Sequence, residues 1–243
     1  KKDYDWIKNN INGFKCEIND KSDDLGLISV QGPNSTKLLN DVFKDVDIRE
    51  LSRFCFKKFE NKIKYKNEII ISKTGYTGSE GYEIYISNED ITVLWNELIN
   101  LNDKYKVMAT GLGARDTLRL EMGYCLYGND IDDNTTPHEA NLMWATNLNK
   151  DFIGKKRLLN SIKNSKKRII NFKMVDRGIP RKGNELFNSN KAKIGNVTSG
   201  TFSPSAKVGI GIGYINDNNY DNLFIKIRDK FLSVDILKLP IHG

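Results

Sequence analysis

A carboxylate beside a glycine-rich turn is the first candidate for chemistry in this sequence. Residues 74–83 read TGYTGSEGYE and end on Glu83. A carboxylate can accept two N–H bonds in one plane, so Glu83 could hold the edge of an aminopyrimidine ring, on which the ring of Tyr76 could stack. Gly75 and Gly78 lack a Cβ and would let the backbone approach such a flat ligand. The alternative is a glycine-rich hairpin in which Glu83 forms a structural ion pair.

An arginine on a predicted helix is the second candidate. The helix is expected to begin after Gly111-Leu-Gly113, and the i, i+4 spacing of Arg115 and Arg119 places both side chains on one face. A guanidinium is planar and permanently charged, so Arg115 could fix a carboxylate or a polar ring edge. In the alternative interpretation, Arg115 pairs with Glu83 or Glu121 and binds no ligand.

The remaining reactive side chains indicate no further catalytic or metal site. Residues 127–134, YGNDIDDN, alternate acids but lack the pattern of an EF-hand loop, so an ordered loop held by Asn and Asp turns is expected. Three cysteines, Cys16, Cys55 and Cys125, lack metal-type spacing, which favours reduced thiols. Cys125 has no base near it in sequence and is expected to be inert.

The composition is that of a globular protein. The chain has 243 residues, of which 39% are hydrophobic and 10% aromatic, enough to bury a core. No apolar run approaches the roughly 20 residues of a membrane span, and residues 1–7 lack the apolar stretch of a signal peptide. The net charge of +7 suits nucleic acid, an acidic partner protein or a polyglutamate tail, but scattered lysines favour a solvated surface over nucleic-acid binding.

Strand and helix patterns alternate through the first 165 residues. Alternating or apolar runs predict strands over 14–18, 25–30, 69–71 and 83–86, and helical spacing predicts helices over 4–11, after Asn34 and over 91–99. Ser87 and Asp90 resemble a capping box ahead of the last helix. Trp144 is expected in the core or in an aromatic pocket wall. The mixture predicts an α+β fold with mostly antiparallel sheet.

Helical signals fade after a polar, basic stretch at 160–167. Strands are expected over 169–174, 184–187, 193–197, 208–215, 223–227 and 231–237, with a hairpin at Asp229-Lys230. Short strands at this spacing predict a small barrel or sandwich. The predicted domains are therefore residues 1–165 and residues 166–243.

Four sequence blocks, taken together, resemble the aminomethyltransferase (T-protein) of the glycine cleavage system. They are residues 74–83, the run 111–144 with GLGARDTLRLE, LYGNDID and TTPHEA, residues 176–181, and residues 198–204. The resemblance covers nearly the whole chain. It implies a three-part fold around a folate channel, in which antiparallel folate-binding domains are followed by a small C-terminal β-barrel.

The resemblance also implies an activity and its residues. Such enzymes transfer an aminomethyl-derived one-carbon unit from a lipoyl carrier protein (H-protein) to tetrahydrofolate and release ammonia. Glu83 matches the family's pterin-contacting glutamate, Arg115 its ligand-contacting arginine, and Tyr76 an aromatic of the same pocket. Arg181 and residues 199–204 match segments at the pocket rim or in domain packing. A bacterial cytoplasm or mitochondrial matrix is the implied location, without nucleic-acid, membrane or metal partners.

One expected departure from the family concerns the catalytic residue. The family's catalytic aspartate belongs to N-terminal sequence ahead of the position of Lys1, about as long as a small domain. The chain is therefore expected to be a fragment with low or no activity alone and without a catalytic residue of its own. Two alternatives remain open: a catalytically silent folate-binding or carrier-docking scaffold, and a related folate-dependent demethylase.

Overall fold

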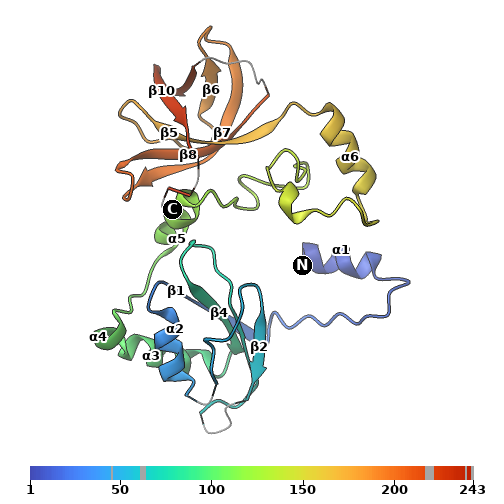
Figure 1. Ribbon diagram of the computed structural model, residues 1–243, viewed down its shortest axis with the longest axis vertical. Helices are drawn as coiled ribbons and strands as arrows, with labels where there is room; N and C mark the ends of the chain where they lie inside the picture. The colour runs from blue at the N-terminus through green and yellow to red at the C-terminus, as the bar shows by residue number, and fades with distance from the viewer. Residues whose placement is uncertain (45, 61–63, 217–221, 239, 242–243) are drawn as a thin grey trace. The chain divides into compact units, whose positions relative to one another are not determined.

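The chain divides into two compact units. The computed structural model describes residues 1–44, 46–60, 64–216, 222–238 and 240–241. The sheet unit comprises residues 1–75 and 79–109, and the barrel unit comprises residues 76–78 and 110–243 (Figure 1). The domain boundary expected near residue 165 stays a prediction.

The sheet unit is built on a four-stranded antiparallel sheet in the order β1-β4-β3-β2. Its elements are α1 (Lys2–Asn10), β1 (Leu25–Gln31), α2 (Ser35–Val42), β2 (Phe56–Phe59), β3 (Ile69–Ser72), β4 (Gly81–Ser87), α3 (Ile91–Asn100) and α4 (Asn102–Tyr105). In the register, Ile84 of β4 lies opposite Ile28 of β1 and Ile71 of β3. These three isoleucines therefore point to the same face of the sheet.

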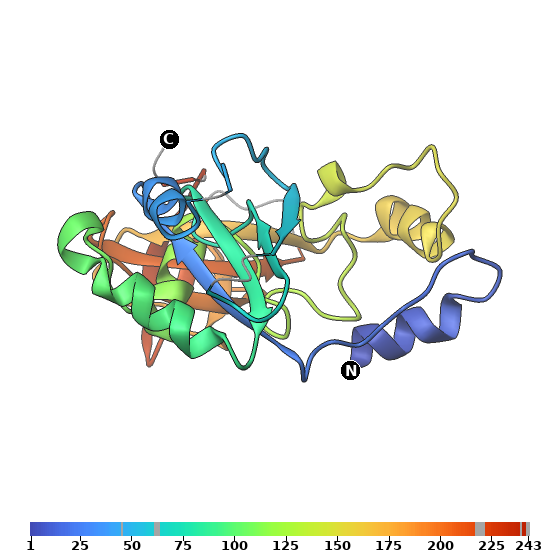
Figure 2. The same cartoon turned by 90° about the horizontal axis from the view of Figure 1, so that it is seen from below.

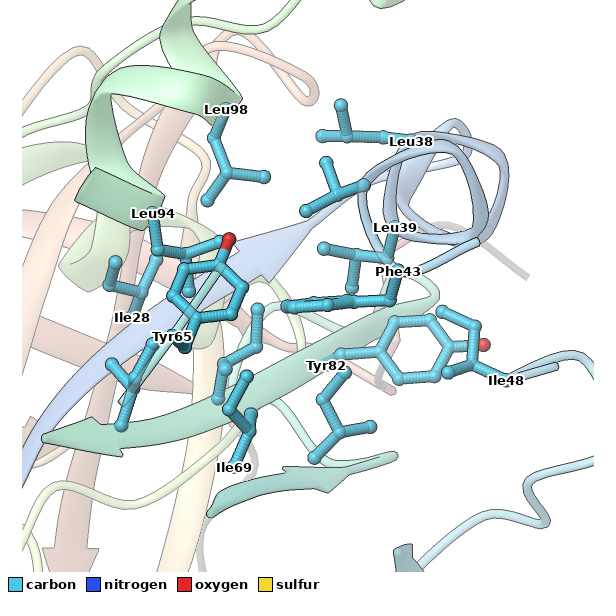
Figure 3. Close-up of a cluster of buried hydrophobic side chains, with 14 residues drawn as sticks. Ile28, Leu38, Leu39, Phe43, Ile48, Tyr65, Ile69, Tyr82, Leu94 and Leu98 are labelled. Carbon is cyan, nitrogen blue, oxygen red and sulfur yellow. The ribbon is translucent and has the colours of Figure 1, made fainter. Parts of the chain in front are cut away.

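One face of this sheet carries the core. Along β4, Tyr82, Ile84 and Ile86 are fully buried, while Glu83 and Tyr85 between them are more exposed, which is the alternation of a half-buried strand. Helices α2 and α3 lie beside β1 and β4 (Figures 1 and 2). Their leucines meet the buried sheet residues in a single cluster (Figure 3), so the core of this unit lies on one face of the sheet.

Shortening a buried β4 side chain tests this assignment of faces. Ile84→Val is expected to lower the free energy of unfolding by about 0.5–1.5 kcal/mol, because the removed methyl leaves a small cavity. Tyr85→Phe, one residue along on the other face, is expected to change it by less than about 0.5 kcal/mol. Urea unfolding of both variants measures the difference, and equal losses would contradict the assignment.

Two sequence predictions for the sheet unit are wrong. Residues 14–18 form no strand, and Phe14 and Cys16 are exposed, because alternation alone supplies no neighbouring strand to pair with. The cap of α3 is Asp90, not Ser87. Ser87 ends β4, and its hydroxyl donates to Asp90 Oδ2 at 2.8 Å, while the amide of Lys66 donates to the same oxygen at 3.0 Å. Asp90 thus joins the helix start to the sheet.

The barrel unit ends in a closed six-stranded barrel in the order β10-β5-β8-β7-β6-β9. Its elements are α5 (Leu112–Glu121), the 3-10 turn η1 (Met143–Ala145), α6 (Lys155–Asn164), β5 (Arg168–Met174), β6 (Glu185–Asn188), β7 (Lys193–Ser203), β8 (Val208–Ile215), β9 (Leu223–Ile227) and β10 (Lys230–Ile236). Phe172, Leu186 and Ile225 are fully buried inside it. The α+β class and the C-terminal barrel are confirmed.

The polar stretch at 160–167 contains the end of α6, in which Leu158 is the buried residue, and among the described residues only strands follow it. The prediction for Trp144 is wrong. Trp144 lies on η1 with 80% of its surface exposed, and it belongs neither to the core nor to a described pocket. A tryptophan beside Leu142 and Met143 indicated burial by composition, but the short turn leaves its ring outside.

Candidate functional site

Glu83 projects from the face of the sheet that faces away from the core. The register places it opposite Ser29 on β1 and Ser72 on β3. Thr74 Oγ1 donates to Glu83 Oε2 at 2.5 Å, and the hydroxyls of Thr74 and Ser72 lie 2.7 Å apart. An ionised carboxylate has about four acceptor positions, and the threonine uses one. The carboxylate is therefore held in place with acceptor capacity left for a ligand.

The glycines of the 74–83 segment serve the chain's own packing. A Cβ on Gly75 or on Gly81 would overlap the side-chain amide of Gln31, and one on Gly78 would overlap Met122. Gln31 Nε2 donates to the carbonyl oxygens of Thr74 at 3.2 Å and Tyr82 at 3.3 Å. The prediction that Gly75 and Gly78 admit a flat ligand is therefore wrong: protein side chains occupy the space that the missing Cβ atoms leave.

Tyr76 and Arg115 lie together in the barrel unit. The guanidinium carbon of Arg115 lies 5.0 Å from the centre of the Tyr76 ring, and the Tyr76 and Tyr124 rings stack with centres 5.8 Å apart. The hydroxyl of Tyr76 donates to the carbonyl of Cys125. Burial raises the pKa of Tyr76 above its usual value, so the phenol stays protonated at neutral pH. The three side chains form a cation-capped aromatic platform, defined here as Tyr76, Tyr124 and Arg115.

A buried ion pair lies behind this platform. Arg119 is 1% exposed, and its Nη1 donates to Asp130 Oδ2 at 2.7 Å and to the carbonyl of Tyr124 at 3.0 Å. Its Nη2 donates to Ser199 Oγ at 2.9 Å, and Thr198 Oγ1 donates to Asp130 Oδ1 at 2.5 Å. The pair thus joins α5 and the loop after it to barrel strand β7. Burial of both charges is tolerated because each is paired and hydrogen-bonded.

The 198–204 segment contributes to packing within the barrel unit. Ser203 Oγ donates to Glu121 Oε1 at 2.5 Å, and Ser205 Oγ donates to Glu121 Oε2 at 3.0 Å, so the end of α5 is also tied to the barrel. Arg181 Nη1 donates to the carbonyl of Gly200 at 3.2 Å. These residues were expected at the pocket rim or in domain packing, and these contacts are packing contacts.

The thiol of Cys125 is chemically quiet. Burial raises its pKa to about 11, above the usual value of about 8.5. At pH 8 the thiolate is therefore more than about a hundredfold scarcer than in an ordinary exposed cysteine. We expect iodoacetamide to modify Cys16 and Cys55, which are exposed, at least about a hundredfold faster than Cys125. Peptide mass spectrometry over time measures the rates, and similar rates at the three cysteines would contradict this.

A separate pocket of about 400 Å3 opens in the barrel unit and contains none of the predicted site residues. It is lined by Asp133, Thr135, Thr136, Pro137, Ala145, Thr146, Asn147, Phe152, Ile153, Gly154, Arg157 and Leu158. Arg157 is the one cationic residue in the lining of this pocket. Its Nη2 donates to the carbonyl of Asp133 at 3.2 Å, so the same side chain also supports the acidic loop 127–134. Sequence reasoning gave no signal for this pocket, since its lining is not contiguous.

The structure thus brings two of the three predicted site residues into contact. Tyr76 and Arg115 meet in the barrel unit, while Glu83 belongs to the sheet unit. Sequence reasoning missed the parts played by Tyr124 and Asp130. The sequence shows several acids in the 127–134 loop, Asp130 among them, but it does not indicate which of them is buried.

Among the described residues, no cluster of three or more His, Cys, Asp or Glu side chains could hold a metal ion. No helix among these residues has the length and apolar character of a membrane span.

Comparisons with known proteins give consistent matches along the chain. Residues 1–150 match the family model of the GCVT N-terminal domain, and residues 167–242 match that of the glycine cleavage T-protein C-terminal barrel domain. Among curated relatives, an aminomethyltransferase of Halothermothrix orenii is 40% identical over 98% of this chain and 67% of its own length. One of Thermosipho melanesiensis is 41% identical over 99% of this chain and 65% of its own length.

A solved structure matches the fold. The glycine cleavage system aminomethyltransferase T of Bartonella henselae superposes with a TM-score of 0.84 at 32% identity, covering 99% of this chain and 65% of that one. The chain therefore spans about two thirds of the length of the relatives it matches.

Proposed function

The chain belongs to the glycine cleavage T-protein family, and we propose that it acts in tetrahydrofolate-dependent aminomethyl transfer. In this reaction the one-carbon unit of an aminomethyl-lipoyl carrier protein passes to tetrahydrofolate, and ammonia is released. The observation that carries the proposal is about 40% identity to curated aminomethyltransferases over nearly all of the chain.

Glu83 is proposed to bind the pterin ring of the folate. Its carboxylate lies on the face of the sheet away from the core, and Thr74 fixes its orientation through one oxygen. The amino group and ring N–H of a pterin offer two donors in one plane, which match the two oxygens of a carboxylate. Glu83 therefore has the chemistry and the immobility to orient such a ring.

We also propose that the platform of Tyr76, Tyr124 and Arg115, taken by itself within the barrel unit, binds a ligand that carries a carboxylate. Arg115 is exposed, and its planar guanidinium can donate two parallel N–H bonds to a carboxylate while it remains over the Tyr76 ring. A folate carries carboxylates on its glutamate tail. The protein's contribution to the reaction would be positioning and electrostatic stabilisation, with the folate nitrogen accepting the carbon unit.

A titration and an assay test the proposal together. We expect calorimetric titration with tetrahydrofolate to show saturable binding that weakens in Arg115→Ala. Ammonia release from aminomethyl-lipoyl carrier protein is expected to be slow for the 243 residues alone, and faster when the remaining third of the family fold is added.

Each outcome separates the proposal from its alternatives. Binding without transfer, even with the added segment, would favour a silent folate-binding scaffold. Demethylation of methylated amines, without turnover of the aminomethyl-lipoyl carrier protein, would favour a demethylase. Absence of binding both with and without the added segment would overturn the proposal.

A further inference from the structure

We propose that the buried pair Arg119–Asp130 is a positioning device for the ligand-binding platform, setting the orientation of Tyr76 and Arg115 from behind. The inference rests on the proposed function for its ligand, but its structural part concerns the barrel unit alone. Neither Arg119 nor Asp130 is among the residues that the family resemblance assigns to the ligand.

The pair is fixed by contacts from three segments. Asp130 is almost fully buried and accepts from Arg119 Nη1, from the amide of Leu126 at 2.9 Å and from Thr198 Oγ1 at 2.5 Å. Arg119 Nε also donates to Asp116 Oδ1 at 2.8 Å. Because both oxygens of Asp130 and all three guanidinium nitrogens of Arg119 are engaged, neither side chain can reorient without losing a bond.

The pair holds the strap, defined as residues 124–130, on which the platform depends. The amide of Tyr124 donates to the carbonyl of Arg119 at 2.9 Å, and the carbonyl of Tyr124 accepts from the Arg119 side chain. The next residue, Cys125, accepts the hydroxyl of Tyr76 through its carbonyl. Two adjacent residues of the strap thus place the ring that stacks on Tyr76 and the oxygen that binds its phenol.

The two tyrosines of the platform transmit this constraint to its third member, Arg115. The guanidinium of Arg115 lies over the Tyr76 ring. That ring is fixed by two contacts: its hydroxyl donates to the carbonyl of Cys125, and its face stacks on Tyr124. A long arginine side chain without such a support samples many rotamers, and each would have to be frozen on binding. The buried pair is therefore expected to favour ligand binding by preorganising Arg115, without touching the ligand.

The test uses a substitution that keeps both charges of the pair. Thr198→Val preserves shape but removes the hydroxyl that Asp130 accepts, and Ser199→Ala provides a second, milder variant that removes an acceptor of Arg119. Ser203→Ala is the matched control, since it removes a hydroxyl from another buried carboxylate of α5, Glu121, away from the strap. Thr198→Ser is the rescue variant.

Tyrosine labelled with 13C at Cζ reports on the platform in the ligand-free protein, and Tyr76→Phe assigns the Tyr76 signal. We expect the signal to move toward that of free tyrosine in Thr198→Val, to move less in Ser199→Ala, to stay in place in Ser203→Ala, and to return in Thr198→Ser. Tetrahydrofolate affinity is expected to fall about tenfold in Thr198→Val and less than twofold in Ser203→Ala.

An unmoved Tyr76 signal in both Thr198→Val and Ser199→Ala, or an equal movement in Ser203→Ala, would overturn the inference. A moved signal with unchanged folate affinity would overturn its functional part. Failure of the proposed function has a different signature, since the wild-type chain would then bind no folate while the Tyr76 signals still decide the positioning role.

Discussion

Replacing Asp130 by alanine is expected to lower the free energy of unfolding of the barrel unit by about 3–5 kcal/mol. The substitution removes a carboxylate that accepts from Arg119, Thr198 and the amide of Leu126. Arg119 is 1% exposed, so its charge would stay buried without its main counter-charge. The loss comes chiefly from this buried cation, which keeps only the partly exposed Asp116 as a counter-charge, and it exceeds what the Arg119–Asp130 pair itself contributes to stability.

A double substitution separates the cost of the buried unpaired charge from the contribution of the ion pair. Arg119→Met with Asp130→Leu removes both charges and is expected to recover more than half of the loss, because an apolar pair of similar size has no desolvation penalty. Asp151→Ala is the control, since Asp151 pairs with Lys155 at 3.1 Å with a fully exposed side chain and should change stability by less than about 0.5 kcal/mol. Urea unfolding followed by circular dichroism measures all three. A cost for Asp130→Ala as small as for Asp151→Ala would contradict the prediction.

Glu83→Gln is expected to weaken tetrahydrofolate binding by about 100-fold, equivalent to about 2.7 kcal/mol. The glutamine keeps the size of the side chain and can still accept from Thr74 through its amide oxygen. It loses the negative charge, however, and presents an N–H group where the ligand also presents an N–H donor. A site built for two donors then leaves one of them unpaired.

The matched control for this substitution is Tyr85→Phe, two residues along the same face of β4. We expect it to retain tetrahydrofolate affinity within about threefold, while both variants retain wild-type stability within about 0.5 kcal/mol. Calorimetric titration gives the affinities, and urea unfolding checks the fold. Wild-type affinity in a stably folded Glu83→Gln would remove Glu83 from the folate site.

The barrel was predictable because each strand shows its own pattern. Apolar residues alternate along β5 and, from Leu232 to Ile236, along β10, and turns separate the strands, so local sequence contains the information. Residues 14–18 show the limit of the same reasoning. Their alternation is as regular, yet a strand also needs a partner with unpaired backbone groups, and the sequence of one segment does not identify a partner.

The sequence suggests residue types for the candidate site but not the contacts that support them. Glu83, Arg115 and Tyr76 were selected because their chemistry suits a ligand, and their part in binding stays a prediction. Asp130 was missed because its burial depends on Thr198, 68 residues further along the chain. The glycines were misinterpreted for a related reason: an absent Cβ leaves space for whatever lies nearest, and only the fold identifies Gln31 as the neighbour of Gly75 and Gly81.

Gln31, Gly75 and Gly81 therefore constrain one another as a set during sequence divergence. A side chain at either glycine position is compatible with this backbone only if residue 31 becomes smaller, and the two carbonyl oxygens that Gln31 binds then lose their donor. We expect the three positions to covary among homologues. A chimera whose crossover falls between residues 31 and 75 should fold only when both parents have the same combination, even if every other exchanged position is neutral.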